Sequence, residues 1–297
     1  MSKEIFVPNK FFSPYFYLLI NYCLNFGKNL ILNRSIEKMN TFLIKLILMP
    51  LIIAGVTLVS KKWGNSIGGI LASLPWVAGP IIMFIAFEQG IDFAANSIAG
   101  SMVGIMGWFA FCAVYILIGQ KYNAFFSVLG GYIVYLLVGT ILNPYIRNLS
   151  VCQWFILSLF VLSIGLRFFP AVNSGIKHFG KKLRFEIPLR MLVITLFVIL
   201  LTYFAEKMGP NWSGILTPFP IMTAVLGVFT HYTQGIYQVR TIFIGLFTGL
   251  FGFTLFLFLQ AILMPKYGIL VSISIGVLLD ILVTLVTKVL FSRLRIV

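Results

Sequence analysis

The sequence has few charged residues, and this shortage excludes most soluble proteins. Charged residues make up 10% of the 297 positions and hydrophobic residues 60%, whereas soluble globular chains are about 25% charged and roughly half apolar. Apolar runs of about twenty residues recur along nearly the whole chain, and no stretch is polar enough to form a separate soluble domain. The composition therefore predicts a polytopic integral membrane protein in contact with lipid.

Residues that carry chemistry are also scarce. The three cysteines match no metal-binding spacing, the chain has only two histidines, and neither an H-E-x-x-H motif nor a Gly-rich phosphate loop is present. These features imply neither a disulfide framework nor a zinc site, and the lack of a phosphate loop disfavours an ATP-driven pump. The few buried acidic residues offer no cage for polyvalent cations. We therefore expect no catalytic residues, no bound metal and no cofactor.

The net charge of +15 has two interpretations. A strongly basic chain can bind nucleic acid, but such proteins concentrate Lys and Arg in a compact domain. Here the basic residues flank apolar spans, which is the pattern that sets the orientation of a protein in the membrane. We therefore expect no nucleic-acid partner.

The apolar runs predict ten membrane-spanning helices. The first lies within residues 11–32 and is interrupted by Pro14, so these residues could instead form an interfacial amphipathic helix, or translation could begin at Met39. The other nine are expected at Thr41–Val59, Ile67–Phe87, Ala95–Ile118, Ala124–Leu142, Val151–Phe168, Met191–Phe204, Gly214–Thr230, Thr241–Leu263 and Ile269–Thr287.

The chain contains one segment twice. Gly64–Gly107 aligns without a gap to Gly209–Gly252, 145 residues later, and 12 of the 44 aligned positions are identical, where chance would give about 4. We call two residues 145 positions apart counterparts. Five predicted spans separate Thr41 from its counterpart Glu186, so the second copy enters the membrane from the opposite side.

These observations predict an all-α bundle of about ten helices built as two inverted five-helix repeats. The repeats are residues 1–145, with an uncertain N-terminal helix in 1–40, and residues 146–297. Most of the positive charge then falls on one side, which includes the basic loop 169–190 and both termini and is expected to be cytoplasmic. The basic segment 28–45 is the exception, because it falls on the outer side with loops 88–97 and 205–212.

This plan resembles the drug/metabolite transporter architecture in span number and length. The chain shares no specific motif with that family, so we assign it to none. The resemblance implies secondary transport by alternating access.

The most informative sites are two proline segments at matching positions, Gly69–Pro75 and Gly214–Pro220. Proline inside a helix removes a backbone hydrogen bond, and in a membrane the freed carbonyl must face protein or a water-lined cavity. Paired broken helices form the binding site in many secondary transporters. Isolated prolines often do no more than kink packed helices. The predicted substrate-binding residues are Ser73, Pro75, Trp76, Thr217, Pro218, Pro220 and Thr223.

Other candidates have simpler explanations. Asp280 lies midway along an apolar span, where an ionisable group is costly and marks a functional site by default, so it is a candidate for ion or proton coupling. Glu88 and His231 lie at span ends and are weaker candidates for the same role. Small residues spaced about four apart let helices approach closely, which predicts helix packing for Gly100, Gly104, Gly107, Gly245, Gly249 and Gly252.

The function that we expect is therefore a permease for a small solute, with the proton as one candidate coupling ion, in a bacterial inner membrane and without enzymatic activity. The alternatives are a channel, an intramembrane lipid-processing enzyme and a helper subunit of a membrane assembly. The sequence leaves the solute and the oligomeric state open.

Overall fold

A computed structural model describes residues 34–63, 70, 73–172 and 186–293 of the chain. The contacts divide the chain into two units, 1–44 and 45–297. Of the first unit, only the beginning of helix α2 (Arg34–Trp63) is described, with Phe42, Leu43 and Ile44 exposed. The helix expected within residues 11–32 lies outside the described residues.

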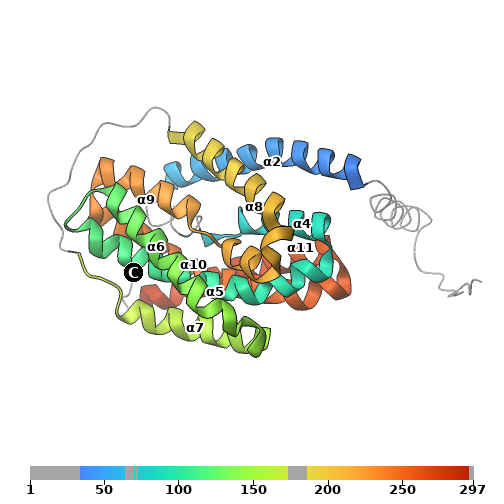
Figure 1. The fold of residues 1–297 in the computed structure, drawn as a ribbon. Coiled ribbons are helices and arrows are strands. Elements are labelled where there is room, and N and C mark those ends of the chain that lie inside the picture. Colours follow the sequence, from blue (N-terminus) through green and yellow to red (C-terminus); the bar gives the residue numbers. More distant parts are fainter. Residues whose placement is uncertain (1–33, 64–69, 71–72, 173–185, 294–297) are drawn as a thin grey trace, which may run out of the picture. The chain divides into compact units, whose positions relative to one another are not determined.

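The described part of the chain is helical, which confirms the all-α prediction (Figure 1). Five of its helices are long and apolar enough to cross a membrane, namely α5, α6, α8, α10 and α11. The chain is thus an integral membrane helical protein. The helices after α2 are α4 (Ala78–Gln89), α5 (Ile91–Gly119), α6 (Ala124–Leu142), the 3-10 helix η1 (Asn143–Asn148), α7 (Val151–Arg167), α8 (Glu186–Leu216), α9 (Ile221–Gln234), α10 (Ile236–Tyr267) and α11 (Ile269–Arg293).

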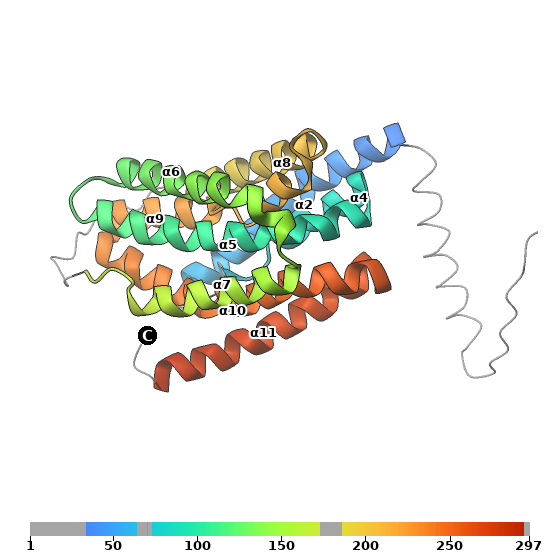
Figure 2. The same ribbon diagram turned by 60° about the horizontal axis from the view of Figure 1, so that its bottom comes forward.

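Helices α5 and α10 form the centre of the second unit. They pack against each other, α6 packs on α5, and α11 packs on α10, so these four helices lie in the order α6, α5, α10, α11 (Figure 2). Most residues of α5 and α10 are buried. By contrast, α6 and α11 expose large apolar side chains such as Phe125 and Leu278, as expected for helices that face lipid.

Helix boundaries repeat at the spacing seen in the sequence. Helix α4 ends at Gln89 and α5 begins at Ile91, and 145 residues later α9 ends at Gln234 and α10 begins at Ile236. The residue between them is Gly90 in one copy and Gly235 in the other, with φ of 97° and 85°. Only glycine adopts such angles readily, which explains why both copies have glycine there. Helices α6 and α11 also begin at counterpart residues, Ala124 and Ile269.

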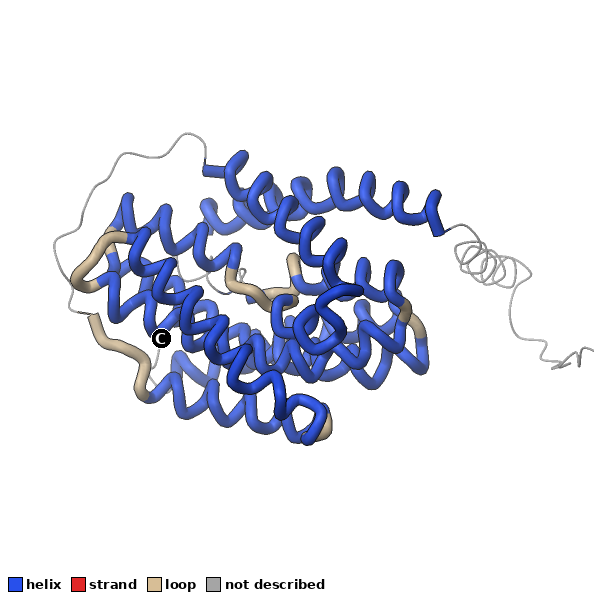
Figure 3. The backbone as a smooth tube through the Cα atoms, viewed as in Figure 1, coloured by secondary structure: helices blue, strands red, loops and turns tan. Residues whose placement is uncertain are grey.

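The structure divides two of the expected spans. The span expected over Ile67–Phe87 is not helical at Leu74–Val77, and the span expected over Gly214–Thr230 is not helical at Thr217–Pro220. Both breaks are loop segments in the interior of the second unit (Figure 3). Helix α8 extends beyond the expected span Met191–Phe204. It is kinked at Gly209 and ends at Leu216.

The plan of ten spans in two inverted repeats stays a prediction. The span expected near the N-terminus lies outside the described residues. Residues 64–69, at the start of one broken span, also lie outside them. The direction of the two half-helices does agree with inversion. Helix α4 runs from its break toward the N-terminal end of α5, whereas His231 near the end of α9 lies against Gly119 at the C-terminal end of α5.

Candidate functional site

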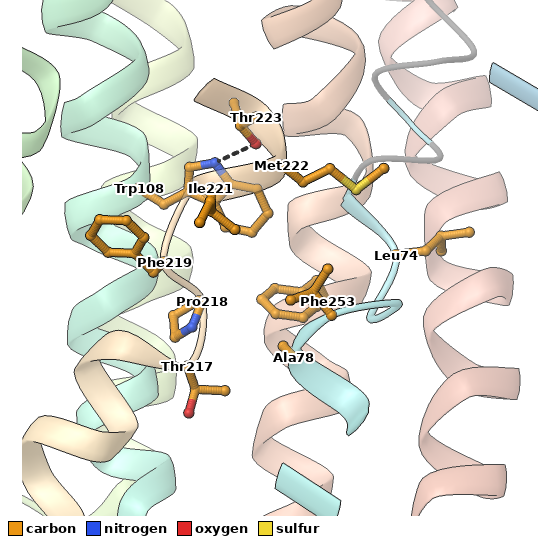
Figure 4. A pocket seen from close by; sticks show the side chains of 11 residues that line it. Leu74, Ala78, Trp108, Thr217, Pro218, Phe219, Ile221, Met222, Thr223 and Phe253 are labelled. Atoms are coloured by element: carbon orange, nitrogen blue, oxygen red, sulfur yellow. Dashed lines mark hydrogen bonds between the residues drawn. The ribbon is translucent and has the colours of Figure 1, made fainter. Parts of the chain in front are cut away.

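The two helix breaks lie on a common pocket. The pocket is small: its space open to a water-sized sphere is about 30 Å³. Helices α5 and α10 contribute one aromatic side chain each, and the rest of the wall comes from the breaks and the first turns of α4 and α9 (Figure 4). The lining residues are Leu74, Val77, Ala78, Trp108, Thr217, Pro218, Phe219, Ile221, Met222, Thr223 and Phe253.

Eight of these eleven lining residues form four pairs of counterparts. The pairs are Leu74 with Phe219, Val77 with Met222, Ala78 with Thr223, and Trp108 with Phe253. A pocket lined by both members of so many pairs lies where the two copies of the repeat meet. Any ligand in it would therefore contact both copies at once.

The breaks have a local cause in the sequence. Pro75 in the first break, and Pro218 and Pro220 in the second, have no backbone N–H to donate to the preceding turn. The half-helices that follow begin at Ala78 and Ile221, and no side chain caps either start. The first backbone N–H groups of a helix lack partners within the helix. Carbonyl oxygens of the breaks satisfy part of this need, since Gly79 N–H donates to Pro75 and Ile221 N–H donates to Phe219.

The pocket is apolar except for two threonines. Thr223 is fully buried, and its Oγ1 accepts a hydrogen bond of 3.1 Å from the indole Nε1 of Trp108. Thr217 donates from Oγ1 to the carbonyl oxygen of Ser213 at 2.8 Å. Both hydroxyls are thus held in fixed orientations. Such a wall suits a small solute that is largely apolar with one or two polar groups.

Three of the seven predicted substrate-binding residues line this pocket, namely Thr217, Pro218 and Thr223. The other four belong to the breaks but not to the wall. The hydroxyl of Ser73 donates to the carbonyl oxygen of Ile70 at 2.6 Å. Trp76 is exposed, and Pro75 and Pro220 are buried in the breaks themselves. For these four residues, substrate contact stays a prediction.

The sequence analysis missed the two aromatic residues of the wall. Trp108 and Phe253 follow the last glycine of the stripe in each copy, and their rings meet edge to face with centroids 5.7 Å apart. They are counterparts, so a search for matched large residues beside the matched glycines could have found them. The identity-based alignment passed over them because one is tryptophan and the other phenylalanine.

The glycine stripes lie where helices approach most closely. A Cβ atom on Gly104 would overlap the carbonyl oxygen of Ile215 and the ring of Pro218. A Cβ atom on its counterpart Gly249 would overlap Ser73, which is the counterpart of Pro218. Each stripe thus packs α5 or α10 against a break. Gly100 likewise lies against the backbone of α8, and Gly107 and Gly252 lie against Tyr135 and Asp280.

Asp280 is fully buried on α11 beside Gly252 and does not line the pocket. Its Oδ1 accepts a hydrogen bond of 3.4 Å from Thr284 Oγ1. Its Oδ2 is buried and has no hydrogen-bond partner in the described part of the chain. A buried carboxyl oxygen without a partner is costly to maintain.

The counterpart of Asp280 is Tyr135, and its polar group does have a partner. The Tyr135 hydroxyl donates to the carbonyl oxygen of Ile215, in the last turn of α8 before the second break. The matching carbonyl before the first break, that of Ile70, accepts from Ser73 instead. The same position in the two copies thus supports a helix end in one and leaves a carboxyl oxygen without a partner in the other.

The two weaker candidates lie at opposite ends of α5. Glu88 accepts a hydrogen bond from buried Lys45 on α2, with 2.5 Å between Nζ and Oε1. His231 Nδ1 lies 3.4 Å from the hydroxyl of Tyr115, and burial lowers the pKa of His231. Within the described residues, no three His, Cys, Asp or Glu side chains gather to hold a metal ion.

Comparisons with known proteins add no assignment, because no family model, no curated protein and no solved structure matches the chain. The functional argument therefore rests on the pocket, the breaks and the buried charges.

Proposed function

We propose that the protein is a secondary transporter that moves a small solute across the membrane by alternating access. The pocket between the two helix breaks is its binding site in this proposal. The observation that supports it best is the pairing of counterpart residues around that pocket. Transporters built from repeats bind their solute where the repeats meet, and they change access by moving one repeat against the other.

The chemistry of the pocket narrows the solute. The pocket is small, because its space open to a water-sized sphere is only about 30 Å³, so in this proposal a solute binds after the half-helices move apart. The hydroxyls of Thr217 and Thr223 can bind one polar group of the solute. The remaining wall, which includes Trp108 and Phe253, suits an apolar body.

We assign the coupling ion to Asp280. A proton taken up by the carboxyl group would give Oδ2 the donor that it needs for a hydrogen bond to a neighbouring acceptor. Glu88 already pairs with Lys45, whereas Oδ2 of Asp280 has no hydrogen-bond partner among the described residues. In this proposal Asp280 binds the proton in one access state and releases it in the other.

The proposal includes ten spans in two inverted repeats in a bacterial inner membrane, with loop 169–190 and both termini in the cytoplasm. A single cysteine at position 182, in a chain without its native cysteines, tests the orientation. An impermeant thiol reagent should label it only after the cells are opened. Labelling in intact cells would show that the orientation is the opposite of the one proposed.

The transport function is tested in two steps with the purified full-length chain. A library of metabolites is first screened for compounds that raise the unfolding temperature, and each compound that does so is then assayed for flux into proteoliposomes. A solute that binds and is transported supports the proposal. If no compound is transported, a helper-subunit role becomes the better explanation.

The variant Pro75→Ala links flux to the break. Alanine restores the missing backbone N–H and favours a continuous helix, so flux should fall about tenfold or more while the unfolding temperature changes little. Pro265→Ala is the matched control, because Pro265 lies within α10 at an exposed position away from the pocket. Equal flux in both variants would show that transport does not depend on the break at Pro75.

A further inference from the structure

Lys45 is a buried cation that joins three helices. Its side chain extends from α2, and Nζ lies 2.5 Å from Glu88 Oε1 at the end of α4 and 2.5 Å from Thr202 Oγ1 on α8. The ammonium also lies 5.1 Å from the ring centroid of Phe84 on α4. The residue is only 4% exposed. The Lys45 ammonium thus links Phe84 and Glu88 of α4 to helices α2 and α8.

The second copy has a buried cation at the matching position. Arg190, the counterpart of Lys45, is 2% exposed, and its guanidinium lies 5.8 Å from the ring centroid of Phe229 on α9. Phe229 is the counterpart of Phe84. Each copy therefore places a buried cation over an aromatic ring of the half-helix that starts at the pocket. At the position of Glu88 the second copy has Thr233, which carries no charge.

The two cation–aromatic pairs lie at opposite ends of the bundle. Glu88 is three residues before the start of α5, whereas His231, two residues after Phe229, lies against Gly119 at the end of α5. Helix α5 has 29 residues and is therefore about 43 Å long. Figures 1 and 2 both show α4 and α9 at opposite ends of α5. The pocket lies between the pairs, where the two half-helices start.

A buried ion pair is a poor source of stability but a strong constraint. The desolvation of the two charges offsets most of their attraction, whereas removal of one partner leaves the other charge buried and alone. A cation over an aromatic ring adds a second, directional attraction. Such contacts suit a helix–helix contact that forms and breaks during function better than one that only stabilises the fold.

We propose that the Lys45–Glu88–Phe84 cluster and the Arg190–Phe229 pair are the two access gates of the pocket, one on each side of the membrane. This inference rests on the proposed alternating access. While Lys45 holds the end of α4 to α2 and α8, the path along α4 is closed. While Arg190 holds the end of α9, the path along α9 is closed. Release of either contact opens the pocket to its own side only.

The experiment measures access to the pocket directly and needs no solute. Ala78 lines the pocket and is buried, so Ala78→Cys, in a full-length chain without its native cysteines, is the reporter. A charged methanethiosulfonate reagent that does not cross the membrane is applied to right-side-out and to inside-out vesicles. The rate of labelling is then compared between the two faces.

Lys45→Met should raise the rate of labelling about tenfold from one face, and Arg190→Met should raise it about tenfold from the opposite face. The exchange of charges, Lys45→Glu with Glu88→Lys, should restore the slow rate on the first face. Lys207→Met is the matched control, because Lys207 lies 5.8 Å from the ring of Phe204 but is exposed. It should change neither rate.

The gate proposal would be wrong if both variants increased labelling from the same face, or if neither variant increased labelling. If Lys45→Met does not yield folded protein, Glu88→Gln keeps the lysine and removes only the carboxylate charge, and it should open the same face. A solute screen that finds no flux would refute transport but would leave the labelling result unchanged. The two proposals can therefore fail separately.

Discussion

The two broken helices have the same backbone plan and different polar contacts. Before the first break, the carbonyl oxygen of Ile70 accepts from Ser73, and one carboxyl oxygen of Asp280 has no hydrogen-bond partner among the described residues. Before the second break, the matching carbonyl of Ile215 accepts from Tyr135, the counterpart of Asp280. Glycine contacts and helix boundaries are duplicated, whereas these polar groups are not.

This difference separates packing from chemistry. Gly104 and Gly249 serve matching close contacts, and a change in either copy should have a similar effect. Asp280 and Tyr135, or Glu88 and Thr233, should give different effects, because only one member of each pair carries an ionisable acid. The comparison of counterpart variants therefore tests which features belong to the fold and which belong to function.

The largest effect is expected for the duplicated packing. Gly104→Leu and Gly249→Leu should each lower the free energy of unfolding by about 3 kcal/mol, the upper end of the usual cost of overpacking, because the side chain would overlap backbone or side-chain atoms of a break. The yield of monodisperse protein in detergent measures this loss. Gly55→Leu is the control, because nothing lies within 4 Å of a Cβ atom there. Unequal losses of folded protein for the Gly104 and Gly249 variants would show that the two glycines do not serve equivalent packing contacts.

A smaller effect on folding, and a large one on coupling, is expected for Asp280→Asn. The amide cannot exchange a proton but occupies nearly the same volume, so solute exchange down its gradient should continue while proton-driven accumulation is lost. Flux with and without an imposed pH gradient measures the ratio. Tyr135→Phe should keep that ratio. Normal accumulation by Asp280→Asn would assign coupling to another residue.

The smallest effect is expected for the hydroxyl that supports the second break. Tyr135→Phe leaves the carbonyl oxygen of Ile215 without this donor, and a buried acceptor without a partner costs about 1–3 kcal/mol. The unfolding temperature in detergent should fall accordingly. Ser73→Ala removes the donor to Ile70 in the other copy and should cost a similar amount. No change in either variant would indicate that water satisfies both carbonyls.

The structure gives a partner to one of the positive charges that do not fit the predicted orientation. Segment 28–45 is basic although the alternation of spans places it outside. Lys45, at the end of that segment, is buried and paired with Glu88, which the same alternation places outside. The pairing neutralises one of the unexpected positive charges within the protein. The rest of the segment up to residue 33 lies outside the described residues.

The amino-acid sequence by itself determined the helical class, the membrane environment, the repeat and the place of the two breaks. Each of these depends on nearby residues: the length of an apolar run, a proline within it, or glycine at positions such as Gly90 that need a positive φ. The same local signals placed Thr217, Pro218 and Thr223 at the site, because they belong to or directly follow a proline segment.

Only the tertiary structure decided which side chains meet. Lys45 is 43 residues from Glu88 and 157 from Thr202, and Trp108 is 115 residues from Thr223. No local pattern specifies contacts over such separations, because they depend on how whole helices pack. The same packing gave Tyr135 a carbonyl oxygen as its partner, whereas its counterpart Asp280 has an oxygen without a partner in the described part of the chain.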